Sequence, residues 1–173
     1  MWSCSSLGAA GVAGALVASC GYGLAEARLP GHPEVTRVAV PVFVNRTIEA
    51  GAEASFADAL RRELAGSGLV VVNVEAADAT VAGTIQALNT QAVAFPVAGG
   101  AVTTGEWSVV VELRIVVTHA GDGRVLYDGR LAEREEYLSA GNAPGTEARR
   151  RIAIAKLGTR LAREARLAMS WAW

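Results

Sequence analysis

The sequence predicts an α+β fold: a two-layer sandwich in which two helices pack on one face of a mixed, mainly antiparallel sheet of about four strands. Apolar side chains occupy every second position from Trp107 to Val117, which is the period of a half-buried strand. The turn sequence Gly121-Asp122-Gly123 follows closely and favours a hairpin. Two other segments space their apolar residues three or four positions apart, as helices with one buried stripe do. We expect a single domain over residues 35–173.

The first strand of the domain is expected over Thr36–Val44. A valine occupies every second position from Val38 to Val44, so these side chains would share one face. Pro41 lies within the run and has no amide hydrogen to donate to a neighbouring strand. The segment is therefore expected at an edge of the sheet or at a bulge.

The first helix is expected over Ser55–Ala65, where apolar residues recur at four-residue spacing from Phe56 to Leu64. Ser55 is the expected N-cap, because its hydroxyl can accept a hydrogen bond from the first turn. Gly66 is expected to end the helix.

A short strand, two long strands and a returning strand are expected next. The expected bounds are Leu69–Val74, Ala79–Val93, Trp107–His119 and Arg124–Tyr137, with a turn at Gly99-Gly100.

The last helix is expected over Thr146–Met169. Its buried stripe is expected to comprise Ile154, Leu157, Leu161, Ala165 and Ala168. The simplest arrangement places both helices on one face of the sheet. The apolar stripes of the helices then pack against the apolar side of the strand Trp107–His119. The other face then stays uncovered and half polar, with Thr84, Gln86, Arg114, Asp128 and Arg130 as its expected members. An exposed sheet face of this kind either remains in contact with solvent, is covered by a partner, or serves as a binding surface.

The N-terminal segment has the pattern of a lipoprotein signal peptide. Residues Leu7–Val17 are small and apolar, and this length suits the core of a signal peptide but is short of the ~20 residues that span a bilayer. Val17-Ala18-Ser19-Cys20 then matches a lipobox, in which small residues precede the cysteine that accepts a diacylglyceryl group. We therefore expect a signal peptide over residues 1–19, an acylated Cys20 and a tether over residues 20–34.

The alternatives for this segment are a buried helix, a misassigned start codon, a plain signal peptide and an uncleaved segment. The residues before Leu7 contain no Lys or Arg, whereas signal peptides usually begin with basic residues. Gly21 follows the cysteine, where an Asp commonly retains lipoproteins in the inner membrane, so sorting to the outer membrane is expected.

Composition argues against several classes of function. The formal net charge of −1 gives no general attraction to nucleic acid. With two His and two Cys, and no spacing typical of zinc ligands, neither a metal site nor a cofactor is expected. The basic terminal helix is interpreted as a solvated face; contact with an acidic partner or a lipid surface, and nucleic-acid binding, are the alternatives.

Catalytic patterns are weak. His32, in the tether, and His119, at a strand end, are expected to be surface residues rather than general bases. Glu133 and Glu135 would share one face of a strand, and with Arg134 between them they suggest a solvated edge. We therefore expect that the chain is not an enzyme, with an unrecognised hydrolase as the least favoured hypothesis.

Several segments, taken in order, resemble the lipopolysaccharide-assembly lipoprotein family LptE. They are CGYGL after the lipobox, VAVPVFVNRT on the first strand, FADALRREL on the first helix, ADATVAGTI, GRVLYDGRLAEREEYL and the terminal Ala/Leu/Arg helix. The resemblance covers nearly all of the expected mature chain. It implies a non-enzymatic, lipid-anchored protein on the periplasmic side of the outer membrane. Such a protein plugs and helps to assemble a β-barrel of the LptD kind, and it binds lipopolysaccharide.

The same resemblance suggests which residues contact lipid. Basic side chains on the sheet are thought to bind lipid phosphates in this family, and Arg114 and Arg130 are the nearest candidates here. An equally good interpretation is that they form cross-strand ion pairs with Glu112 or Asp128. The alternative function is a periplasm-facing envelope lipoprotein that acts as a binding module or scaffold in another system.

Overall fold

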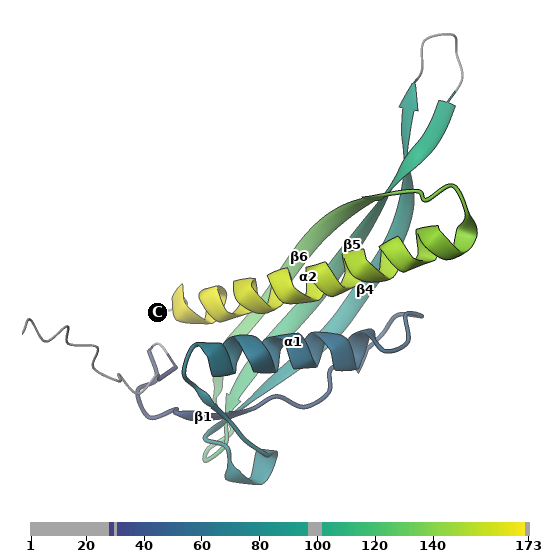
Figure 1. The fold of residues 1–173 in the computed structure, drawn as a ribbon. Coiled ribbons are helices and arrows are strands. Elements are labelled where there is room, and N and C mark those ends of the chain that lie inside the picture. The colour runs from purple at the N-terminus through teal and green to yellow at the C-terminus, as the bar shows by residue number, and fades with distance from the viewer. Residues whose placement is uncertain (1–27, 30, 97–101, 172–173) are drawn as a thin grey trace, which may run out of the picture.

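The computed structural model describes residues 28, 29, 31–96 and 102–171 of the chain. In chain order the elements are β1 (Arg37–Ala39), β2 (Val44–Asn45), α1 (Ala52–Gly66), β3 (Val70–Val71), a 3-10 turn (Val74–Ala76), β4 (Ala79–Pro96), β5 (Val102–His119), β6 (Val125–Leu138) and α2 (Ala143–Trp171). Both helices lie on the same face of one sheet, so the predicted two-layer α+β arrangement is confirmed (Figure 1).

The sheet has six strands in the order β3-β1-β4-β5-β6, with β2 also paired to β4. The expectation of about four strands in a mainly antiparallel sheet was therefore wrong. β1 pairs in parallel with both β3 and β4, and β2 pairs in parallel with β4. Only the long strands β4, β5 and β6 form antiparallel pairs. The parallel strands are two or three residues long, which is too short for an alternating pattern to reveal them.

The expected first strand is broken into β1 and β2 around Pro41. Val38 and Val40 are buried, as predicted, but Val42 and Val44 are more than half exposed. Phe43 takes the core position instead, and its ring lies against Gly83, where a Cβ atom would come within 2.6 Å of it. The missing amide hydrogen of Pro41 allows the chain to leave the ladder, and the face presented to the core changes there.

Helix α1 begins three residues earlier than predicted. Its N-cap is Gly51 with φ 88°, a conformation that glycine adopts without steric cost, so the expectation of Ser55 as N-cap was wrong. The predicted stripe is confirmed, since Phe56, Leu60 and Leu64 are all buried.

Helix α2 is longer at both ends than predicted. The Asn142 side chain accepts a hydrogen bond from the Gly145 amide at 2.8 Å, so the first turn is capped before the expected start. Ile154, Leu157, Leu161 and Ala165 are buried as expected. Ala168 is only half-buried, and Met169 occupies the core in its place.

The long hairpin of β4 and β5 extends past the ends of the helices (Figure 1). These strands reach Pro96 and Val102, further than the sequence pattern indicated. The predicted turn after β5 is confirmed by a hydrogen bond from the Gly123 amide to the His119 carbonyl. The predicted turn at Gly99-Gly100 lies outside the described residues.

Candidate functional site

The two arginines predicted for the uncovered sheet face lie directly opposite each other. Arg114 of β5 pairs in register with Arg130 of β6 on one side and with Thr84 of β4 on the other. Thr84 is in turn opposite Val44 of β2, so four strands contribute one row of side chains. Gln86, also predicted for this face, falls in a register shift of β4. The row is on the side of the sheet that the helices leave open.

Arg114 and Asp128 form the cross-strand ion pair that the sequence suggested. Arg114 Nε donates to Asp128 Oδ1 at 2.8 Å, and Nη2 donates to Oδ2 at 2.5 Å. These two hydrogen bonds lower the pKa of the Asp128 carboxyl and raise that of Arg114. Both side chains are 43% exposed, so the pair remains accessible to solvent.

Arg130 differs from Arg114 because it is exposed and makes no ion pair or hydrogen bond with any described residue. Its charge is close enough to lower the pKa of Asp128, though less than Arg114 does. The row therefore contains one neutralised arginine and one uncompensated arginine.

Glu133 and Glu135 were placed on a solvated edge by the sequence, and this was wrong. They lie opposite the buried Val111 and Val109, and so on the helix side of β6. Arg160 of α2 contacts them at 3.4 and 3.1 Å, and Lys156 contacts Glu135 at 3.2 Å. The basic face of α2 is thus partly used to hold that helix against β6.

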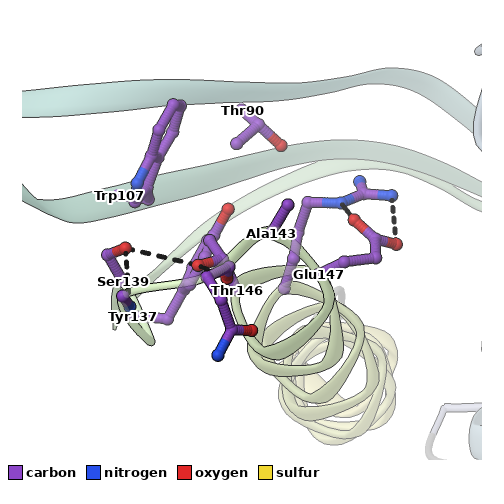
Figure 2. A pocket seen from close by; sticks show the side chains of 10 residues that line it. Thr90, Trp107, Tyr137, Ser139, Ala143, Thr146 and Glu147 are labelled. Carbon is purple, nitrogen blue, oxygen red and sulfur yellow. Dashed lines mark hydrogen bonds and ion pairs between the residues drawn. The ribbon is translucent and has the colours of Figure 1, made fainter.

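A pocket of about 530 Å³ lies where β6 leads into α2 (Figure 2). Thr90, Trp107 and Tyr137 form its wall on the sheet, and Ser139 and Thr146 border it from the loop after β6 and from α2. The Thr146 hydroxyl is within 3.3 Å of Ser139 Oγ and accepts a hydrogen bond from the Ala140 amide. Burial raises the pKa of Tyr137.

The acidic residue of this pocket is already paired. Glu147 accepts hydrogen bonds from Arg150 at 2.8 Å and from Arg151 at 3.0 Å, which lower its pKa. Arg150 also contacts Glu49 at 2.8 Å and so ties α2 to the loop before α1. Neither histidine nor cysteine lines the pocket.

The two histidines have structural partners. His32 is 7% exposed and lies next to Glu34 at 3.2 Å, so the expectation that it is a surface residue was wrong. His119 Nδ1 is 2.8 Å from Asp122 in the turn after β5. Among the residues that the structure describes, no three His, Cys, Asp or Glu side chains gather as a metal site.

Cys20, the predicted acylation site, lies outside the described residues. Leu29, which the sequence placed in the tether, is 3% exposed and belongs to the core. No helix in the described part of the chain is both long and apolar enough to cross a bilayer.

Solved structures with the same fold include three small bacterial proteins. A putative lipoprotein from Caulobacter crescentus is 12% identical with a TM-score of 0.53, over 75% of this chain and 88% of that one. The rare lipoprotein B from Shewanella oneidensis is 12% identical with a TM-score of 0.54, over 78% and 93%. The hypothetical protein CT253 from Chlamydia trachomatis is 14% identical with a TM-score of 0.53, over 78% and 98%. At these identities the likeness shows the fold alone.

No curated protein matches the chain in sequence. The model of one protein family does match, over residues 35–169, and this is nearly the whole of the predicted domain. Its description is LptE, lipopolysaccharide-assembly.

Proposed function

Because the chain belongs to the LptE lipopolysaccharide-assembly family, we propose that it partners and plugs an outer-membrane β-barrel and contacts lipopolysaccharide there. The family is non-enzymatic, and its members are lipoproteins of lipopolysaccharide assembly. The single observation that carries the proposal is the family match over residues 35–169. The proposed location is the periplasmic side of the outer membrane, with acylated Cys20 as the anchor.

The uncovered sheet face supports a role in binding. A two-layer fold buries one face of its sheet under helices, and the other face is free to meet a second surface. Here that face carries charges of both signs, so it suits the hydrophilic interior of a barrel, and the phosphates of a lipid headgroup, better than acyl chains. We assign contact with an LptD-like barrel to the whole domain and contact with lipid to this face.

Arg130 is the proposed main contact for a lipid phosphate, with Arg114 beside it. An arginine binds phosphate through charge-assisted hydrogen bonds, and such bonds are strongest when no carboxylate competes for the guanidinium. Asp128 competes for Arg114 through two hydrogen bonds, whereas no described residue accepts a hydrogen bond from Arg130. The two arginines therefore contribute unequally, although they sit in the same row.

This inequality makes the proposal testable with three single variants. Arg130→Ala should weaken lipopolysaccharide binding by roughly tenfold, and Arg114→Ala by a smaller factor, because its charge is already neutralised. Asp128→Asn should strengthen binding, because it releases the Arg114 guanidinium. Equilibrium binding of the purified chain to lipopolysaccharide, measured at two salt concentrations, gives all three values. If Asp128→Asn weakens binding, or if the double variant Arg114→Asp with Arg130→Asp binds normally, lipid contact is not made at this row.

Purification of the chain from membranes tests the proposal that it plugs a β-barrel. The chain should co-purify with a large β-barrel protein in mild detergent, and depletion of the chain should reduce lipopolysaccharide at the cell surface. Depletion that leaves surface lipopolysaccharide unchanged would favour a scaffold in another envelope system.

A further inference from the structure

The pocket between β6 and α2 contains polar groups that no described residue satisfies. Tyr137 is only 9% exposed, yet its hydroxyl makes no hydrogen bond with any residue that the structure describes, and it is directed into the pocket (Figure 2). The Thr90 hydroxyl, on the same wall, is likewise without a partner in the described part of the chain. Both hydroxyl groups are therefore available to a ligand as donors and as acceptors.

The same wall offers an aromatic surface. Trp107 of β5 and Tyr137 of β6 are register partners on the helix side of the sheet. Trp107 is half-buried, so part of its indole remains open to the pocket. Aromatic side chains with a polar group suit a ligand that has an apolar face and a polar rim.

The charged side chains at the pocket balance one another. Arg150 contacts Glu147 and Glu49, each at 2.8 Å. Arg151 contacts Glu147 at 3.0 Å. Two guanidinium groups thus meet two carboxylates, and this leaves little net charge to attract an ion. A purely apolar ligand is also disfavoured, because it would cover these groups and the two free hydroxyl groups without replacing their contacts with water. The pocket therefore suits a neutral ligand that carries hydroxyl groups.

The loop that borders the pocket is already held in place. The Ser139 amide donates to the Gly105 carbonyl at 2.8 Å, and Arg149 donates to the Ser139 carbonyl at 2.8 Å. The Thr146 hydroxyl donates to the Asn142 carbonyl at 2.8 Å. Because these contacts order the loop without a ligand, binding has little ordering entropy to overcome.

We propose that this pocket binds one hexose ring of a saccharide, with the C–H face of the ring stacked on Trp107. The hydroxyl groups at the rim of the ring meet the free hydroxyls of Tyr137 and Thr90 and the carboxylate of Glu147. The volume of about 530 Å³ lies within the roughly 300–1,000 Å³ of small-molecule sites. Two sources supply such a ring. One is the sugar part of lipopolysaccharide, in which case the inference rests on the proposed function, and the other is a free saccharide.

Binding of defined saccharides to the full chain tests the pocket and distinguishes the two sources. The chain is purified in a detergent without sugar groups and studied by saturation-transfer NMR and calorimetry. The probes are methyl glucoside, methyl galactoside and the core oligosaccharide released from the lipopolysaccharide of the same cells, without its lipid. At least one methyl hexoside should bind with a Kd of about 1 mM or weaker, as its size allows. An oligosaccharide that binds at least about tenfold tighter identifies lipopolysaccharide as the source, and equal affinities identify a free saccharide. No saturation transfer to any of the three probes would overturn the proposal.

Matched tryptophan substitutions on α2 locate the bound ring. Ala143 is exposed and borders the pocket, so Ala143→Trp should fill the pocket without disturbing the core and weaken binding at least about tenfold (Figure 2). Ala148→Trp adds the same side chain at an exposed position that does not line the pocket, and it should bind like the wild type. Binding that survives Ala143→Trp, or that falls equally in Ala148→Trp, would contradict the assignment to this pocket.

Substitutions of Trp107 test the stacking itself. Trp107→Ala should weaken binding at least about tenfold, whereas Trp107→Phe keeps an aromatic face and should retain most of the affinity. If the two variants bind equally, the ring is not stacked on Trp107. The methyl hexosides carry no phosphate, so their binding does not depend on the contact proposed for Arg130, and either proposal can fail alone.

Discussion

Gly158→Ala should destabilise the fold even though alanine is the better helix residue. Gly158 lies within α2 where that helix crosses Phe56 of α1. A Cβ atom there would lie 2.8 Å from Phe56 Cδ1 and 3.0 Å from Cε1, well inside van der Waals contact. Phe56 is 2% exposed, so its ring has no free space into which it can turn. The added methyl group therefore has to push the two helices apart.

The magnitude follows from two opposing effects. Overpacking of a tight core costs about 1–3 kcal/mol, and replacing glycine by alanine inside a helix returns about 0.5–1 kcal/mol. These ranges leave a net loss of about 0–2.5 kcal/mol, and we expect about 1 kcal/mol in the free energy of unfolding, measured by urea denaturation followed by circular dichroism.

Gly66→Ala supplies the matched control. It lies at the end of α1 and a Cβ atom there has no neighbour within 4 Å, so the substitution should be neutral or slightly stabilising. If Gly158→Ala is as stable as Gly66→Ala, the close approach of the two helices at Phe56 is not as the structure shows it.

The remaining predictions concern the β1–β4 junction and the membrane anchor. Asp78 accepts hydrogen bonds from the Arg37 guanidinium and from the Arg37 and Thr36 amides, and these hold its pKa well below the usual range. Because the pKa of Asp78 is lower in the folded state, the ionised carboxylate stabilises the fold above the unfolded-state pKa of about 3.9, and this stabilisation is lost as the pH falls. Asp78→Asn should therefore lower the free energy of unfolding by about 2 kcal/mol at pH 7, measured by urea denaturation. The loss of stability in the variant should shrink below about pH 4. Equal deficits at pH 7 and pH 3 would contradict this. Cys20→Ala should remove the acyl group and release the chain from membranes, as read by mass spectrometry and fractionation; full membrane retention of the variant would argue against the anchor.

The sequence predicted the long elements well because each has a sustained period. Only a strand buries the alternating apolar residues from Trp107 to Val117 on one side. Only a helix does so for Phe56, Leu60 and Leu64, which are four positions apart. The position of Arg114 and Arg130 on one face followed from the same alternation, and the register of β5 with β6 confirms it.

Features that depend on contacts between residues far apart in the sequence were not predicted. Val42 and Val44 continue the alternation of β1, but the break at Pro41 and the space above Gly83 bring Phe43 into the core instead. Glu133 and Glu135 carry no local signal for facing the helices, since their partners, Lys156 and Arg160, lie more than twenty residues away in the chain. The preference of Arg114 for Asp128 over Glu112 likewise depends on side-chain geometry and not on spacing.

The most direct test of the proposed function is what accompanies the full chain out of the outer membrane. Membranes are extracted in mild detergent, the chain is captured, and its partners and N-terminal peptide are identified by mass spectrometry. A photo-crosslinking residue at Ala132, exposed on the uncovered face beside Arg130, records direct contacts. The account predicts a large β-barrel protein in near-equal amount, crosslinked through position 132, and an acylated Cys20. Recovery of the chain alone after crosslinking, with no barrel protein attached, would contradict it.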